Sequence, residues 1–297
     1  SDFSMQNLND LLALAPIWLL LPALVFGAIL GSFYNVVIAR LPLMLQSQWQ
    51  DEAEHTYAAQ LQKEPGTAQR FNLFVPRSCC PNCGATVRAV DNIPLLSFVV
   101  LRGRCRSCRQ SIHWRYPAVE LSSALLTALA TWHFSLGPAL FFAITLIGIS
   151  LILLAIDSEH MLLPDTLTLG LLWLGLLANI SALFTPLENA VLGAVLGYSV
   201  LWVLFWVAKW LTGQETMGYG DFKYLAAIGA WFGPEGVLLG LLIASTLGTV
   251  AGLGARIFGS LQRYQKVPFG PFLAIAAVTL LFAKATLSYW LWGGLYG

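Results

Sequence analysis

Apolar residues occur in long blocks separated by shorter polar connections. Eight of these blocks approach the length of about 20 residues with which an apolar helix crosses the roughly 30 Å hydrocarbon core of a bilayer. They cover residues 16–38, 118–134, 138–157, 165–184, 189–209, 221–233, 236–256 and 271–292. The pattern therefore predicts an all-α polytopic membrane protein with about eight transmembrane helices.

One long polar stretch, residues 40–117, interrupts these blocks. We therefore expect three parts: an N-terminal transmembrane anchor (1–39), a soluble domain (40–117) and a transmembrane domain (118–297). The first block lacks a basic region in front of it and ends at Arg40, so it is expected to stay as an anchor. Composition agrees, because 57% of residues are hydrophobic and 10% are charged, whereas soluble domains carry about 25% charged residues.

Two blocks are less regular than the others. The sixth holds only about 13 residues before Pro234, enough for roughly 20 Å of helix, which is short for a full crossing. The eighth contains Lys284, whose ammonium group must reach the membrane surface or face protein. The predicted number of spans depends on both.

Basic residues indicate the orientation. Ten of the sixteen Lys and Arg residues fall between the first two blocks, which places residues 40–117 in the cytosol and the N-terminus outside. Lys209, Arg256, Arg263 and Lys266 then also lie inside. Acidic residues dilute the charge of the polar stretch, so we expect no nucleic-acid partner. The oligomeric state is left open.

Four cysteines of the polar stretch form two CxxC pairs, Cys80 with Cys83 and Cys105 with Cys108, separated by 21 residues. This spacing is typical of a structural zinc site with four thiolate ligands. Two disulfides are the alternative, and a cytosolic location argues against them because thiols stay reduced there. Cys79 is left over as a free thiol.

Two aspartates stand at block boundaries. Asp157 closes the third block, and Asp221 opens the sixth behind Gly218 and Gly220. Counting spans from an external N-terminus brings both acids to the cytosolic boundary. A carboxyl group at this depth is costly and suggests function. Two of them could share one proton and activate water, as in an aspartyl protease, while glycines without side chains let a substrate backbone approach.

Two alternatives compete with this interpretation. Asp221 could merely cap a helix, as we expect Asp165 to do after Pro164. Asp157 ends a helix, where a negative charge opposes the helix dipole, and this placement favours function. Both acids could instead form a proton relay in a transporter or channel, with the cysteine domain as a regulatory zinc module.

The chain resembles the type IV prepilin peptidases, also called leader peptidase and N-methyltransferase, a family of GxGD-type intramembrane aspartyl proteases. The resemblance extends over almost the whole chain, in the expected order. The matching stretches are 31–37 (GSFYNVV), 40–42 (RLP), the two CxxC pairs, 92–94 (NIP), 115–117 (RYP) with Glu120, 156–165, 218–223 (GYGDFK) and 268–271 (PFGP).

The resemblance implies a bifunctional enzyme of the bacterial inner membrane with active sites facing the cytosol. It would cleave the leader of prepilins and pseudopilins after a glycine, with Asp157 and Asp221 as catalytic residues. It would then methylate the new N-terminal amine with S-adenosylmethionine. The methylation part would lie in the cysteine domain and the adjoining start of the second span. The resemblance assigns no residue to the methyl donor.

Overall fold

The computed structural model describes residues 16–61, 72–73, 75, 77–214, 217–257 and 267–292. Residues 1–15 of the expected anchor, and the basic residues Arg263 and Lys266, lie outside the described residues. The described chain is helical apart from loops and two isolated β-bridges. It divides into two compact units, residues 1–128 and 129–297.

The first unit is built on α2 (Pro16–Leu61) and the start of α4 (Arg115–His133). Close packing between them depends on glycine: a Cβ on Gly27 would lie 2.7 Å from the carbonyl oxygen of Ser123, and a Cβ on Gly31 would lie 2.7 Å from Cα of Glu120. The Ser123 hydroxyl also donates a 2.7 Å hydrogen bond to the Gly27 carbonyl. Small residues thus hold these two apolar helices together, as is usual in lipid.

Between α2 and α4, the described chain forms two short helices and two cysteine turns. The helices are the 3-10 helix η1 (Ala89–Asn92) and α3 (Leu96–Val100). A bidentate ion pair joins η1 to the second cysteine turn, with Arg106 Nη2 2.6 Å and Nε 2.9 Å from oxygens of Asp91. This ion pair and the cysteine turns organise a segment that has little apolar core of its own.

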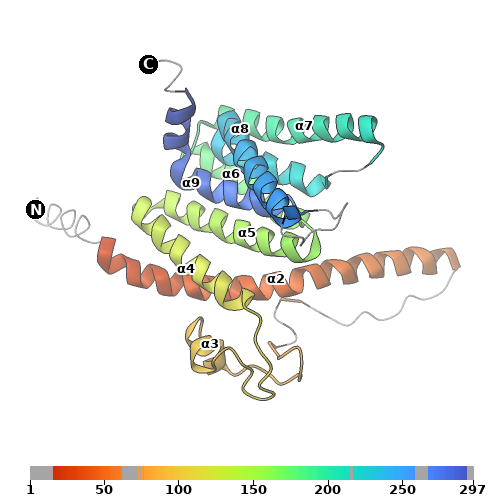
Figure 1. Ribbon diagram of the computed structural model, residues 1–297, viewed down its shortest axis with the longest axis vertical. Coiled ribbons are helices and arrows are strands. Elements are labelled where there is room, and N and C mark those ends of the chain that lie inside the picture. The colour runs from red at the N-terminus through yellow and green to blue at the C-terminus, as the bar shows by residue number, and fades with distance from the viewer. Residues whose placement is uncertain are drawn as a thin grey trace, which may run out of the picture. The chain divides into compact units, whose positions relative to one another are not determined.

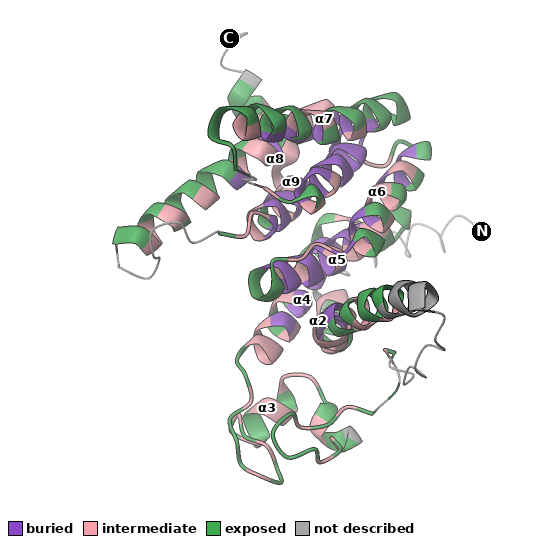
Figure 2. Ribbon diagram, turned by 90° about the vertical axis from the view of Figure 1, so that its right-hand side faces the viewer, coloured by how far each residue is buried: buried purple, intermediate pink, exposed green. Residues whose placement is uncertain are grey.

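The second unit contains the end of α4 and five longer helices. These are α5 (Pro138–His160), α6 (Asp165–Ile180), α7 (Leu187–Thr212), α8 (Tyr219–Ile257) and α9 (Gly270–Trp292). Helix α8 packs against α6, α7 and α9, and α5 packs against α9 (Figure 1). Buried residues concentrate on α5, α6, α9 and the first part of α8, whereas much of α7 is exposed (Figure 2). The apolar exposed faces are those expected to meet lipid.

Helix α8 is bent back on itself at Gly233, whose φ of 76° and ψ of −172° are not helical. Pro234 follows directly. A Cβ on Gly240 would lie 3.3 Å from Cγ2 of Ile228, although a straight helix would separate these residues by about 18 Å. The two arms therefore pack side by side, which matches the division into blocks 221–233 and 236–256 expected from the sequence.

The bend frees backbone carbonyls, and polar side chains from two other helices satisfy them. Pro234 has no N–H to donate to the carbonyl of Ala230. Nδ2 of Asn179 in α6 donates to that oxygen at 2.9 Å. Nζ of Lys284 in α9 donates to the carbonyl of Phe232 at 2.7 Å. Lys284 therefore faces protein, which resolves the irregularity noted for the eighth block.

Five helices of the described chain are long and apolar enough to cross a membrane: α2, α5, α7, α8 and α9. Helix α6 is also apolar but has only 16 residues. Each of the eight predicted blocks falls on a helix or on one arm of α8, so the predicted all-α, multi-pass membrane fold is confirmed. The largest difference in the boundaries is at α2, which continues beyond Arg40 as far as Leu61.

Candidate functional site: a buried carboxyl pair and a cysteine cluster

The two predicted aspartates lie together in the second unit. Asp157 occupies the last turn of α5 and Asp221 the first turn of α8. The two residues are 5% and 7% exposed, and the carboxyl groups are close enough for a direct electrostatic interaction. The fold thus brings together two acids that are 64 positions apart in the sequence.

Gly270, the first residue of α9, holds Asp157. Its backbone N–H donates a 3.0 Å hydrogen bond to Oδ2 of Asp157. A Cβ at this position would lie only 2.6 Å from the same oxygen, so the contact requires glycine. The sequence pattern alone gave Gly270 no role. The available signal was its place between Phe269 and Pro271, at a predicted helix start where backbone N–H groups are free.

The loop before Asp221 has the glycines expected at this site. A Cβ on Gly220 would lie 2.7 Å from Cβ of Leu163, so a side chain there would push the loop away from its neighbour. Around Gly218 the nearest atom is Oδ2 of Asp221, at 3.8 Å from a Cβ position. Gly220 therefore permits close packing, whereas Gly218 borders open space beside the carboxyl group.

Leu163 connects the surroundings of the two acids. It lies against Gly220, next to Asp221, and its Cδ2 would lie 3.0 Å from a Cβ on Gly270. The short connection between α5 and α6 thus packs against both the loop that carries Asp221 and the backbone that holds Asp157. This role of Leu163 was also missed, because an apolar residue in a loop has no distinguishing pattern.

Asp165 does not cap α6, and that expectation is wrong. The helix begins at Asp165 itself, and its N-cap residue is Pro164, which makes no side-chain capping bond. Both carboxylate oxygens of Asp165 instead lie 2.6 Å from Nζ of Lys223 in α8. The ion pair joins α6 to the turn that carries Asp221.

The oxygen Oδ1 of Asp221 is buried and has no hydrogen-bond partner among the described residues. Buried polar oxygens are usually paired, so such an atom is a candidate for contact with water or substrate. A small apolar hollow of about 280 Å³ lies near the start of α9 and includes Phe269, the neighbour of Gly270. The hollow is lined by α8 and by the chain at the start of α9, and neither aspartate lines it.

The four predicted cysteines of the first unit also come together. The Sγ atoms of Cys80, Cys83, Cys105 and Cys108 all lie within 4.8 Å of one another. The sulfurs of Cys80 and Cys108 are 3.9 Å apart, close to the roughly 3.8 Å edge of a tetrahedron with zinc–sulfur bonds of about 2.3 Å. The cluster therefore fits a tetrahedral metal ion, and none of the five cysteines forms a disulfide.

Two turns of the same geometry present these sulfurs. In the first, the N–H of Gly84 donates to the carbonyl of Cys80 at 2.9 Å, and in the second, the N–H of Arg109 donates to the carbonyl of Cys105 at 3.0 Å. Gly84 and Arg109 occupy equivalent positions with φ of 68° and 57°. The second turn thus places an arginine in a backbone conformation that favours glycine.

The four thiols differ in how readily they ionise. Backbone N–H groups, first that of Cys83 and then that of Asn82, lower the pKa of Cys80 to about 7. The backbone N–H of Gln110 likewise lowers the pKa of Cys108. The backbone N–H of Ala85 lowers the pKa of Cys83, but burial and hydrogen bonds to the other three thiols outweigh it and raise this pKa to about 11. Thiolates are the form that binds metal, so Cys80 and Cys108 are the thiols best prepared for a cation. Cys79 is exposed and lies outside the cluster.

These features define a multi-pass membrane protein with a buried carboxyl pair and a separate four-thiol site. Residues 25–134 match the family model described as the bacterial peptidase A24 N-terminal domain, and residues 144–253 match that of the type IV leader peptidase family. No solved structure matches the chain.

Curated relatives agree with the family models. The chain is 46% identical over 286 residues to a prepilin leader peptidase/N-methyltransferase of Stutzerimonas stutzeri, covering 94% of this chain and 96% of the relative. It is 45% identical over 265 residues to that of Aeromonas salmonicida strain A449 (89% and 91%). It is 43% identical over 273 residues to that of Pseudomonas aeruginosa (91% and 92%). The chain belongs to the prepilin leader peptidase/N-methyltransferase family.

Proposed function

We propose that this protein cleaves the leader peptide of type IV prepilins and pseudopilins after a glycine and then methylates the new N-terminal amine. The names of its relatives support both activities. The observation that carries the peptidase assignment is the meeting of Asp157 and Asp221, each nearly fully buried, at adjoining helix ends. We assign proteolysis to residues 118–297 and methylation to residues 40–117.

In the proposed mechanism the two carboxyl groups hold one proton between them, because two neighbouring buried acids resist joint ionisation. The ionised group accepts a proton from water as the water oxygen attacks the scissile carbonyl. The protonated group donates to the carbonyl oxygen. Collapse of the tetrahedral intermediate breaks the C–N bond, and the leaving amine takes up a proton from the pair.

The surroundings of the pair suit an extended substrate. Gly218 borders open space beside Asp221, so a peptide backbone could approach the carboxyl group there. Oδ1 of Asp221, which lacks a donor among the described residues, is the atom that we assign to the attacking water. The apolar hollow that includes Phe269 and Phe272 would take an apolar substrate side chain near the cleaved bond.

We propose that Cys80, Cys83, Cys105 and Cys108 hold a structural zinc ion. Four protein ligands close the coordination sphere, so the ion would cross-link the two turns rather than activate water. S-adenosylmethionine would supply an electrophilic methyl group to the substrate amine. The residues that bind this methyl donor are not assigned.

We further propose that the protein lies in the bacterial inner membrane with its N-terminus outside and both sites facing the cytosol. The concentration of arginines in residues 77–115 supports this orientation. The partners would then be prepilins and pseudopilins, which enter from the bilayer with a basic leader on the cytosolic side.

The decisive experiment incubates the purified full-length protein with a prepilin and S-adenosylmethionine and measures the intact mass of the product. Loss of the leader and gain of one methyl group are expected. Asp157→Asn and Asp221→Asn should each abolish cleavage but leave methylation of a pre-cleaved substrate. Full cleavage by both variants would overturn the peptidase assignment. Proton-coupled solute flux in proteoliposomes without cleavage would instead identify the rival transporter.

A further inference from the structure

Helix α3 is short and apolar, and its side chains are unusually exposed. Leu96, Val99 and Val100 are 57%, 71% and 67% exposed, and none of the five residues of α3 is buried. An aliphatic surface of this kind is unfavourable in water and usually marks a contact with protein or lipid. Neither the carboxyl pair nor the cysteine cluster uses these side chains.

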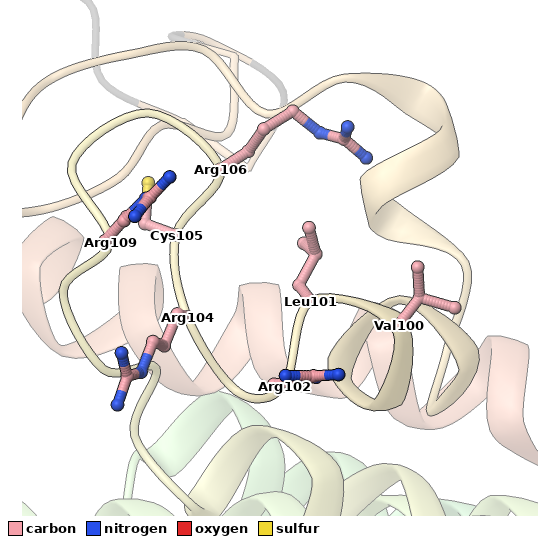
Figure 3. A pocket seen from close by; sticks show the side chains of 7 residues that line it. All are labelled: Val100, Leu101, Arg102, Arg104, Cys105, Arg106 and Arg109. Carbon is pink, nitrogen blue, oxygen red and sulfur yellow. The ribbon is translucent and has the colours of Figure 1, made fainter.

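Four arginines follow this helix within the stretch 102–109. Together with Val100, Leu101 and Cys105 they line an open hollow of about 510 Å³, and their guanidinium groups spread around it (Figure 3). Within the described part of the chain, Arg106 is the only one of the four that forms an ion pair, with Asp91. The hollow therefore carries a net positive charge and suits an anionic group. Its arginines are Arg102, Arg104, Arg106 and Arg109.

Two of these arginines occupy positions where the backbone alone would favour glycine. Arg102 has φ of 52° and Arg109 has φ of 57°. The left-handed conformation is unfavourable for a residue with a side chain, and glycine adopts it freely. Strain of this kind is typical of positions whose side chain serves a function.

The start of α3 is tied to the membrane-spanning helices of its own unit. The N–H of Leu95 donates a 2.8 Å hydrogen bond to Oε2 of Glu120 in α4. Cα of Glu120 packs directly on Gly31 of α2. Gly31 lies nine residues before Arg40, where the apolar block of α2 ends, which is about 13 Å along the helix. Glu120 itself lies two residues inside the second apolar block (118–134), so the beginning of α3 is held near the expected membrane boundary.

We propose that α3 and the arginines that follow it form an anchor in the cytosolic leaflet, which binds the surface of an anionic bilayer. The aliphatic side chains of α3 enter the edge of the hydrocarbon region. Arg102, Arg104 and Arg109 bind headgroup phosphates through charge-assisted hydrogen bonds. The combination of an apolar face and a basic rim is that of an interfacial helix. This inference rests on the proposed orientation, and it places the cysteine cluster on the membrane surface.

The test compares hydrogen–deuterium exchange of residues 93–110 in the full-length protein in two kinds of nanodisc. One contains phosphatidylcholine alone and the other also contains phosphatidylglycerol. Exchange should be slower in the anionic disc by roughly fivefold for each engaged arginine, since each is worth about 1 kcal/mol at such a surface. The double variant Arg102→Gly/Arg109→Gly should lose most of this difference and keep only the roughly fivefold share of Arg104. Glycine fits both backbone positions, so this variant removes charge without imposing strain.

A second pair of variants tests the apolar contact. Val99→Asp should speed exchange in α3 in both discs, whereas Val75→Asp, at a valine that is also exposed (53%), should leave α3 unchanged. Equal exchange of the wild type in both discs would overturn the proposal. So would protection by inorganic phosphate in the neutral disc, because it would identify a small-anion site. Leader cleavage in detergent should persist in all these variants, which separates this test from that of the peptidase.

Discussion

The backbone N–H of Gly270 donates to Oδ2 of Asp157 across 113 positions of sequence. The first residue of α9 thereby fixes the side chain at the end of α5, and Leu163 packs against both Gly270 and the loop before Asp221. The carboxyl pair is therefore oriented by backbone and apolar contacts from three separate connections. A change in any of these three connections should lower the rate of leader cleavage more than it lowers the stability of the protein.

Replacement of Gly270 by alanine tests this dependence directly. The new Cβ would lie 2.6 Å from Oδ2 of Asp157, so the carboxyl group must move. A displacement of about 1 Å in a catalytic group costs on the order of 100-fold in rate. We expect Gly270→Ala to lower kcat for leader cleavage by about that factor.

Gly252→Ala is the matched control, because no atom lies within 4 Å of a Cβ at that helical position. Alanine should maintain cleavage there and stabilise α8 by up to about 1 kcal/mol. Equal rates in the two variants, measured with one prepilin substrate, would contradict the role of Gly270.

The ion pair of Asp165 and Lys223 predicts a charge-swap result. The side chain of Asp165 is 58% exposed and that of Lys223 is 24% exposed. Because water screens exposed charges, the coupling energy of this ion pair should be small, about 0.2–1 kcal/mol. Asp165→Lys and Lys223→Asp should each slow cleavage a few-fold, because the turn that carries Asp221 loses its tie to α6. The double swap should restore most of the rate. A double variant as slow as the worse single variant would show that the pair does not act as a unit.

Removal of one thiol should release the metal ion. Cys105→Ser takes away one of four clustered ligands. Loss of a residue that only hydrogen-bonds a ligand weakens metal binding by about 10- to 100-fold, so loss of a ligand itself should weaken it by more than about 100-fold. Elemental analysis of the purified protein, together with competition by a chelator, measures the change. Cys79→Ser is the control, since Cys79 is exposed and outside the cluster. Wild-type protein that is purified without metal and takes up none would contradict the assignment.

The pair of Asp91 and Arg106 predicts a pH dependence. Its hydrogen bond and charge hold the pKa of the Asp91 carboxyl below its usual range, which is near 3.9. A group with a lowered pKa contributes stability above its usual pKa and loses that contribution as the pH falls through the lowered value. Asp91→Asn should therefore destabilise the cysteine domain at pH 7, and the difference from wild type should vanish in acid. Hydrogen-exchange protection of residues 89–109 measures the stability difference between wild type and Asp91→Asn. If that difference did not change with pH, the ion pair would not be its origin.

Several features of the fold could be predicted because they depend on local pattern. The apolar blocks located the helices, and Pro234 marked the bend of α8, since proline cannot continue a helical hydrogen-bond ladder. The meeting of Asp157 and Asp221 followed from counting spans, which places alternate block ends on the same side. The four cysteines could be grouped from spacing alone, because a CxxC turn leaves few geometries for its sulfurs.

Other features depend on tertiary contacts that the pattern does not encode. The roles of Gly270 and Leu163 arise from a backbone N–H and an apolar side chain, neither of which is distinctive in sequence. Asp165 was predicted as a cap because it follows a proline, but its carboxylate forms an ion pair with Lys223, 58 positions away. The end of α2 was placed at the change of polarity near Arg40, whereas a helix can leave the membrane and continue in water.

The bend at Gly233 has a consequence for how the second unit comes apart. Asn179 and Lys284 supply hydrogen bonds to carbonyls near the bend, the first of them buried and the second partly buried, and neither donor belongs to α8. Pulling α6 away would leave the buried Ala230 oxygen without a donor at a cost of several kcal/mol in an apolar medium, and pulling α9 away would remove the donor of the Phe232 oxygen. Helices α6, α8 and α9 therefore depend on one another for their hydrogen bonds, and we expect them to unfold in one cooperative step.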